Sequence, residues 1–532
     1  MIKAKPHLLR LNKDDTPFLN LRSSLVFASI VVLFIAARLW RLTASCLWFD
    51  EIFSRHAARY GWGRMMEFVA ADLIHPPLFY ALLKVWIGIG GDSLLWLRLF
   101  PALAALAAIL PFFLLCRELR LRASEMNLAL LLMAANGYLI KYAQELRMYS
   151  LLLLLTLCSL WLFVRFFNDD ASPRHRLLAL SVVNLLLVYT HYYSWLVVAV
   201  EAVFLLLRGR RKRASFFIAV ALLLICFSPW VYAVTVASEQ GGGLEQNIGW
   251  VTRPRLREVA QYLTLLNEPF YFRQSSNEPL YQRLSAALAL LLCGLPLLAL
   301  IWHALSRQVD EARADALRFL LLCAFLPLAL ALSVSWILPQ SIWGTRHLII
   351  VAAPYSILTS IALIRLRPYW IKVTAFILLG GWLFWAGTVF LLLRQERYIW
   401  CAWNDLVAQA IQAEPATPEA ARLYAFEDLV AYHLWFALEE AGSERFKVAV
   451  IKGTPGLRED PAYFLPRRFD DIKTGDISAL NGDHFWIAFR DISWDEDRPP
   501  LKTLKDRGYR VNKVLETTAQ GQRAFLVHLL RR

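Results

Sequence analysis

The feature that most constrains this chain is a series of long apolar segments separated by short, basic loops. A helix needs about 20 mostly apolar residues to cross the hydrocarbon core of a bilayer. No small-residue cleavage site follows the first segment, which we therefore interpret as an anchor and not as a signal peptide. The sequence predicts an α-helical polytopic membrane protein with eleven spans, at 24–43, 97–116, 126–141, 148–167, 177–190, 193–207, 215–235, 284–305, 318–338, 347–364 and 370–393.

The composition agrees with a membrane protein. Hydrophobic residues occupy 58% of the 532 positions, whereas a soluble domain is about 45–50% apolar. The 57 Lys and Arg residues exceed the 42 Asp and Glu residues, which leaves a net charge of +15. We assign this excess to cytoplasmic loops and not to nucleic-acid binding. These values exclude an ordinary soluble enzyme, a disordered chain and a disulfide-stapled secreted domain.

The topology depends on one ambiguous stretch, Pro76–Gly90, which is short for a span and contains Lys84. If this stretch does not cross, the basic loops share one face with the Lys-rich N-terminus; if it crosses, they divide between two faces. The positive-inside rule therefore selects eleven spans, with the N-terminus inside and the C-terminus outside. Residues 44–96 then form one outer loop with helices along the membrane surface. The basic loops are Arg117–Arg122, Arg174–Arg176, Arg208–Arg213, Arg307–Arg318 and Arg365–Lys372.

Residues 394–532 differ in composition from the rest of the chain. They lose the long apolar runs and gain Asp, Glu, Pro and Lys. Short β-rich runs and two helical patterns predict a small α/β domain outside the membrane. The runs are Phe446–Ile451, Phe485–Phe489 and Ala524–Leu529, and the helical patterns are 403–413 and 427–440.

Five of the seven cysteines fall inside apolar runs, whereas Cys46 and Cys401 lie outside them. We interpret the cysteines as small buried hydrophobic residues, since no CxxC motif or regular spacing is present. A Cys46–Cys401 disulfide is the alternative, and it requires that both residues face an oxidising compartment.

Ionisable residues near a membrane are costly and are often functional. In the predicted topology they gather at the outer ends of spans, from loops far apart in the sequence. We therefore expect these loops to converge on the outer face. The candidates are Asp50, Glu51, His75, Glu145, Arg147, Tyr149, His191, Tyr192 and Arg346.

Each candidate also has a purely structural interpretation. Asp50 and Glu51 could cap a helix, and His75 before two prolines could end a loop. Glu145 and Arg147 could form an interfacial ion pair. The tyrosines and His191 suit an interfacial aromatic belt, and Arg346 could be a topology signal.

The order of these motifs resembles the GT-C membrane glycosyltransferases of family 39 type. WFDE at 48–51, HPPLFYALL at 75–83, LRLFPALAA at 97–105 and YAQELRMYSL at 142–151 look like the N-terminal half of this superfamily. THYYSW at 190–195 and GTRHLIIVAAP at 344–354 look like later landmarks. Protein O-mannosyltransferases and lipid A aminoarabinose transferases are the groups resembled, over roughly residues 24–365.

This resemblance implies a GT-C fold and a polyprenyl-phosphate-sugar donor such as an undecaprenyl-phosphate sugar. The enzyme would be a hexosyl- or pentosyltransferase of the bacterial inner membrane, acting on the periplasmic face on an unidentified glycan, lipid or protein acceptor. Asp50 matches the carboxylate treated as the catalytic base, Glu51 matches its acidic neighbour, and Glu145 matches a further acid. Arg346 followed by His347 departs from the Arg-Tyr pair common at that landmark. The expected division is 1–23 cytoplasmic, 24–393 transmembrane and catalytic with 44–96 as the first periplasmic loop, and 394–532 periplasmic.

The residues support a single displacement with inversion. Asp50 would take the proton of the acceptor hydroxyl, while Arg147 and Arg346 would stabilise the departing phosphate. Tyr149, Tyr192 and the two histidines, His75 and His191, would hold the donor. No cofactor is required by this scheme. A divalent metal held by Asp50, Glu51, Glu145 and His75 is allowed but is not implied by their spacing.

Three alternatives stay open. A lipid-linked saccharide transporter or flippase would place polar groups near the bilayer midplane, where Asn184 and Glu201 are the main polar residues. An O-antigen ligase or polymerase would also use Arg and His at the outer face. A scaffold whose C-terminal domain binds a partner would leave the Asp50–Glu51 pair unexplained.

Overall fold

The computed structural model describes residues 9, 11, 20–169, 174–241, 245–270, 279–306, 311–392, 398–414, 420–457, 465–519 and 521–532. The chain forms two compact units. The first contains 1–42, 75–236 and 251–393, and the second contains 43–74, 237–250 and 394–532. Much of segment 1–23, which we expect to be cytoplasmic, and part of the expected loop Arg307–Arg318 lie outside the described residues.

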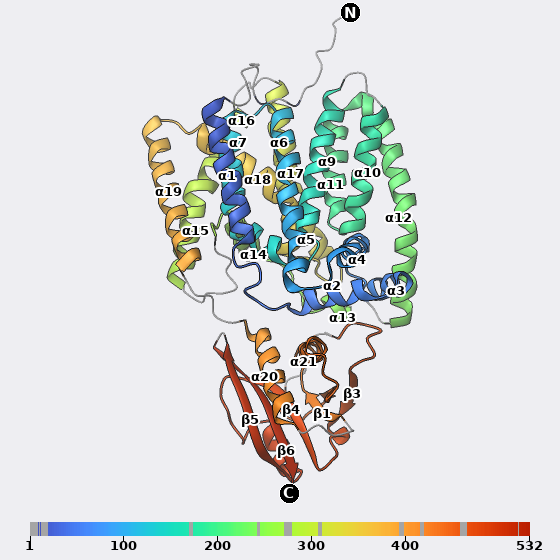
Figure 1. The fold of residues 1–532 in the computed structure, drawn as a ribbon. Helices are drawn as coiled ribbons and strands as arrows, with labels where there is room; N and C mark the ends of the chain where they lie inside the picture. The colour runs from blue at the N-terminus through green and yellow to red at the C-terminus, as the bar shows by residue number, and fades with distance from the viewer. Residues whose placement is uncertain are drawn as a thin grey trace, which may run out of the picture. The chain divides into compact units, whose positions relative to one another are not determined.

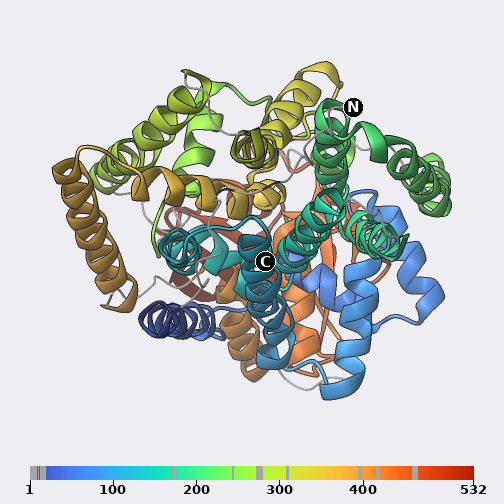
Figure 2. The same ribbon diagram turned by 90° about the horizontal axis from the view of Figure 1, so that it is seen from above.

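The first unit is a bundle of helices, which Figure 2 shows largely end-on. Mean hydropathy and length mark eight candidate membrane spans among the described residues. They coincide with eight of the expected spans, so a multi-pass membrane protein is confirmed. The helices are α1 (Leu21–Leu39), α4 (Leu78–Gly90), α5 (Leu94–Ala107), α6 (Ile109–Glu118), α7 (Ala123–Ala135), α8 (Gly137–Gln144), α9 (Tyr149–Asn168), α10 (Arg174–Thr190), α11 (Ser194–Arg208), α12 (Arg213–Gly241), α14 (Leu256–Leu265), α15 (Pro279–Ala289), α16 (Leu295–Ser306), α17 (Glu311–Ile337), α18 (Ala352–Ile364) and α19 (Tyr369–Leu392). The other three expected spans correspond to shorter helices, α10 with 17 residues, α11 with 15, and α7 and α8 with 13 and 8, and the total of eleven stays a prediction.

The expected continuous span 126–141 is wrong, because the chain breaks at Asn136 between α7 and α8. Asn136 has an extended backbone, and its side chain accepts a hydrogen bond from the Leu139 N–H at the start of α8. The buried guanidinium of Arg38 donates to the Met133 and Ala134 carbonyls at the end of α7. These two side chains satisfy backbone groups that a helix end leaves unpaired, so the break is stable inside the bundle.

The second unit is built on a six-stranded sheet of order β3-β2-β1-β4-β6-β5. The first four strands of this order run parallel, and β6 pairs antiparallel with β4 and β5. Phe485, Phe525 and their neighbours form its apolar core. The strands are β1 (Ala421–Ala425), β2 (Phe446–Lys452), β3 (Lys473–Asp476), β4 (His484–Asp491), β5 (Tyr509–Ala519) and β6 (Gln522–Arg531), and helices α20 (Ala402–Ala413), α21 (Asp428–Glu440) and α22 (Leu501–Asp506) accompany them (Figure 1).

The α/β class of the C-terminal segment is confirmed, as are its three predicted strands and two predicted helices. The second unit also includes a part of the chain that sequence composition does not connect with it. Helices α2 (Phe49–Arg59), α3 (Trp62–Asp72) and α13 (Glu245–Ile248) belong to it. Cys46 and Cys401 form a disulfide with a Cα–Cα distance of 5.5 Å. Our interpretation of these two cysteines as unpaired hydrophobic residues is therefore wrong.

Candidate functional site

Three imidazole rings meet in the first unit, each from a turn between helices. His75 lies just before α4, His191 lies between α10 and α11, and His347 lies in the 3-10 helix Thr345–Val351 that leads into α18. Their candidate ligand atoms all lie within 4.8 Å of one another. The ring centres are 5.4 Å apart for His75 and His191, and 4.6 Å apart for His191 and His347. The helix packing thus brings together three residues that are remote in sequence.

Two arginines place positive charge next to this histidine cluster. Nη2 of Arg147 lies 3.3 Å from both ring nitrogens of His75, and its Nη1 donates to the Tyr80 hydroxyl at 3.3 Å. Arg147 itself is only 2% exposed. The charge of Arg346 also acts on His75 and His191. The site therefore contains two permanent positive charges, that of the buried Arg147 and that of the half-buried Arg346.

The histidines are neutral partners of these charges. Burial, followed by the charge of Arg147, holds the pKa of His75 well below its ordinary value. The same two causes lower the pKa of His191 to about 3. Both groups are therefore uncharged near neutral pH, and each can act through one N–H donor and one nitrogen acceptor.

The hydrogen bonds of His191 fix where its proton lies. Its Nδ1 accepts the Tyr193 N–H at 3.0 Å, so the proton of the neutral ring is on Nε2. That Nε2 is buried and has no hydrogen-bond partner within the part of the chain that the structure describes, and the same holds for both ring nitrogens of His347. A buried polar group without a partner costs about 1–3 kcal/mol. Such a cluster is suited to receive a ligand oxygen.

A metal ion fits this cluster less well than its spacing suggests. Tetrahedral Zn²⁺ with Zn–N bonds of about 2.1 Å places the centres of two imidazole ligands roughly 5 Å apart, close to the separations observed here. A ligating nitrogen must be unprotonated, however, and the other ring nitrogen normally donates a hydrogen bond. His191 shows the reverse arrangement, and the Arg147 cation is beside His75. The chemistry favours an anion over a cation.

A glycine and several tyrosines shape the cluster. A Cβ atom at Gly344 would lie only 2.4 Å from Nδ1 of His347, so the ring packs where only a glycine leaves space. The Tyr149 ring centre lies 6.1 Å from that of His347, and the Tyr193 ring centre lies 5.1 Å from it. The Tyr138 hydroxyl donates to the Thr345 carbonyl at 2.8 Å. These contacts hold the turn that carries Arg346 and His347.

Asp50 and Glu51, the two acids of the expected first outer loop, belong to the second unit. Asp50 and Glu51 lie in the first turn of α2, where acids interact favourably with the helix dipole. The Glu51 carboxylate accepts the Trp48 N–H at 3.2 Å, so this acid does cap its helix. Glu51 is 2% exposed, whereas Asp50 is half-buried.

The structure brings together most of the candidates in the first unit. Two candidates, His75 and His191, are members of the histidine cluster. Three others lie beside it: Arg147, Tyr149 and Arg346. Glu145 is buried two positions before Arg147. Tyr192 instead contacts α12, where its hydroxyl accepts the Trp230 indole N–H at 3.1 Å.

Sequence reasoning missed one member of the cluster, His347, and two of its neighbours, Tyr80 and Tyr193. His347 directly follows Arg346, and Tyr193 follows the candidates His191 and Tyr192. These adjacent positions were the available signal.

The solved structures that match this chain share its fold. ArnT from Cupriavidus metallidurans bound to undecaprenyl phosphate matches with a TM-score of 0.55 at 15% identity, over 95% of this chain and 97% of that chain. Its apo form gives a TM-score of 0.54 with the same identity and coverage. An oligosaccharyltransferase of Archaeoglobus fulgidus tethered with an acceptor peptide matches at 14% identity over 81% of this chain and 64% of that chain, with a TM-score of 0.48. No family model and no curated protein matches the sequence. The chain therefore shares the fold of the two ArnT structures.

Proposed function

We propose that this protein is an integral-membrane glycosyltransferase that moves a sugar from a polyprenyl-phosphate donor to an acceptor hydroxyl. The observation that carries the proposal is the basic cluster of two arginines and three histidines, in which Arg147, His75 and His191 are buried while Arg346 and His347 are half-buried. Guanidinium groups bind phosphate oxygens through charge-assisted hydrogen bonds, and the Nε2–H of His191 supplies a further donor. A structure with the same fold is that of ArnT bound to undecaprenyl phosphate.

The reaction would be a single displacement. Asp50 accepts the proton of the acceptor hydroxyl as the oxygen attacks the anomeric carbon. The bond between that carbon and the phosphate oxygen breaks, and its electron pair leaves with the lipid phosphate, whose charge Arg147 and Arg346 stabilise. Glu51, the acidic neighbour of Asp50, and Glu145 complete the assigned catalytic acids, and Glu145 would help to hold donor and acceptor in line. Such a displacement inverts the anomeric configuration and requires neither a cofactor nor a protonating acid for the leaving group.

The assigned location is the periplasmic face of a bacterial inner membrane. The charge distribution of the loops supports this orientation. The Cys46–Cys401 disulfide also supports it, because disulfides persist in oxidising compartments. The acceptor class and the hexosyl or pentosyl character of the sugar are open, since both depend on pocket shape.

The test is a transfer assay with purified protein and a panel of undecaprenyl-phosphate sugars, with membrane extract as the source of acceptor. One donor should be consumed by the wild type, and Asp50→Asn should lower turnover by about 10²-fold or more while donor binding is retained. Glu67→Gln in the neighbouring helix α3 is the matched control, because Glu67 is largely exposed and pairs with Arg468. Equal turnover of the Asp50 and Glu67 variants would remove Asp50 from the mechanism, and a folded wild type that consumes no donor contradicts the proposed function.

A further inference from the structure

Helix α2, which carries Asp50 and Glu51, packs along one face of α21 within the second unit. The Phe49 ring lies 5.4 Å from that of Tyr432, and the His56 ring lies 5.1 Å from that of Trp435. The α21 residues in contact are Tyr432, Trp435, Phe436 and Glu439. Their spacing of three, four and seven positions is that of a single helix face, so the two helices meet along a continuous surface.

The chain entering α2 is fixed covalently. Cys46 precedes Asp50 by four positions and is joined to Cys401, the residue just before α20. The Cys46 N–H also lies 3.2 Å from the Cys401 sulfur. The segment that leads into the first turn of α2 is therefore attached to the C-terminal part of the second unit.

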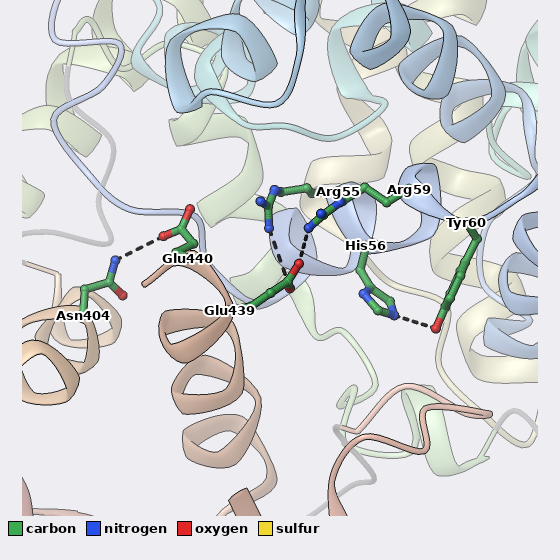
Figure 3. A network of polar contacts seen from close by, with 7 residues as sticks. All are labelled: Arg55, His56, Arg59, Tyr60, Asn404, Glu439 and Glu440. Atoms are coloured by element: carbon green, nitrogen blue, oxygen red, sulfur yellow. Dashed lines mark hydrogen bonds and ion pairs between the residues drawn. The ribbon is translucent and has the colours of Figure 1, made fainter. Parts of the chain in front are cut away.

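The other end of α2 is held by charge, as Figure 3 shows. Arg55 and Arg59 both form ion pairs with Glu439, and the Arg55 contact measures 3.9 Å. The Arg55 side chain is 10% exposed and its guanidinium lies 5.0 Å from the Phe436 ring centre. Arg59 and Glu439 are more exposed, at 46% and 30%, so solvent partly screens this pairing.

The position of Glu439 is electrostatically unfavourable within its own helix, α21. It lies in the last turn of α21, which contains no basic residue, and a negative charge near a helix C-terminus is unfavourable. Its contacts with α2 compensate for this placement. The carboxylate therefore serves the docking of α2 more than the stability of α21.

We propose that the C-terminal domain holds helix α2, and with it Asp50 and Glu51, in position. Glu439 and the Cys46–Cys401 disulfide are the positioning residues. The effect on catalysis rests on the proposed function, whereas the attachment of α2 to the C-terminal domain does not. Catalytic groups must be held within about 0.5 Å of their productive geometry, and a helix fixed at both ends meets that requirement. Glu439 acts through α2 and touches no substrate in this scheme.

The experiment compares Glu439→Gln with Glu440→Gln in the full-length protein. Glu440 is the matched control because it is the adjacent acid of α21 and its carboxylate accepts a hydrogen bond from the Asn404 side-chain amide of α20 at 3.5 Å (Figure 3). Hydrogen exchange of residues 47–60 should be roughly fivefold faster in Glu439→Gln, the effect of losing about 1 kcal/mol. It should be unchanged in Glu440→Gln, and kcat should fall in Glu439→Gln while donor KM stays constant.

Two further variants keep the result interpretable. The charge exchange Arg59→Glu with Glu439→Arg keeps one ion pair but places the introduced arginine beside Arg55, so it should restore slow exchange and kcat only in part. Cys46→Ser with Cys401→Ser should accelerate exchange at the start of α2. Equal exchange in the Glu439 and Glu440 variants overturns the inference, as does faster exchange with unchanged kcat in an active enzyme. If the wild type transfers no sugar, the proposed function fails. The hydrogen-exchange data still decide whether the C-terminal domain holds α2 in position.

Discussion

Replacement of Arg147 by methionine tests the phosphate-binding role of the histidine cluster. The guanidinium offers two nitrogens near His75 and Tyr80, and it is buried, so little water screens it. A hydrogen bond to a charged group contributes about 1.5–3 kcal/mol. If the donor phosphate engages this group through one or two such bonds, the loss of about 2–3 kcal/mol weakens binding by about 30- to 150-fold.

The assay is binding of undecaprenyl phosphate to the purified protein, measured by calorimetry. Arg147→Lys keeps the charge but loses the planar pair of donors, so we expect an intermediate affinity. Arg117→Met, at an exposed arginine near the end of α6, is the control and should bind like the wild type. An affinity of Arg147→Met within about twofold of the Arg117→Met value would refute the phosphate-binding reasoning, because a buried charge on the phosphate cannot contribute so little.

Two further predictions concern buried titratable groups. Ser159 Oγ lies 2.6 Å from both the Asn184 Oδ1 and the Glu201 Oε1, while Asn184 donates to Glu201 Oε2 at 2.8 Å; since one hydroxyl has one proton, Glu201 supplies the other and is neutral. Glu201→Gln should therefore keep the melting temperature near that of wild type, whereas Glu201→Ala should lower the free energy of unfolding by about 2–4 kcal/mol. Equal destabilisation of the two variants in a thermal melt would contradict the ring of hydrogen bonds among Ser159, Asn184 and Glu201. In the second unit, burial and the neighbouring arginines lower the pKa of His56 to about 4. The unfolded state then binds more protons below pH of about 6.5, so the contribution of His56 to stability is complete above that pH and is lost as pH falls toward 4, by up to about 1.4 kcal/mol per pH unit. His56→Gln should flatten this part of the stability profile, and an unchanged slope in melts from pH 8 to 4 would count against it.

Local patterns were sufficient wherever one segment decides its own structure. The run Phe446–Ile451 became β2 and the pattern 427–440 became α21, since apolar periodicity reports directly which face is buried. The ordered motifs also led to the correct fold, because they combine information from many loops. The broken span at Asn136 shows the limit: its cap is local, but the Arg38 that binds the preceding carbonyls comes from α1.

The candidate site shows the same limit. His75 and His191 were selected because ionisable residues near a membrane are costly and are often functional, and the structure does place them together. His347 was passed over as a departure from a motif, although its ring is the one nearest to His191 within the cluster. Contact among three turns depends on helix packing, which no single window of sequence contains.

The division of the chain into two units gives the remaining candidates different physical roles. The groups that we propose to bind the donor phosphate are held in the first unit by buried hydrogen bonds and by the space at Gly344. The acids Asp50 and Glu51 are held in the second unit by the disulfide and Glu439. A variant of the first group should therefore change donor affinity, whereas a variant that loosens α2 should change kcat. That separation is measurable, and it would be absent if Asp50 and Arg147 both acted only in donor binding.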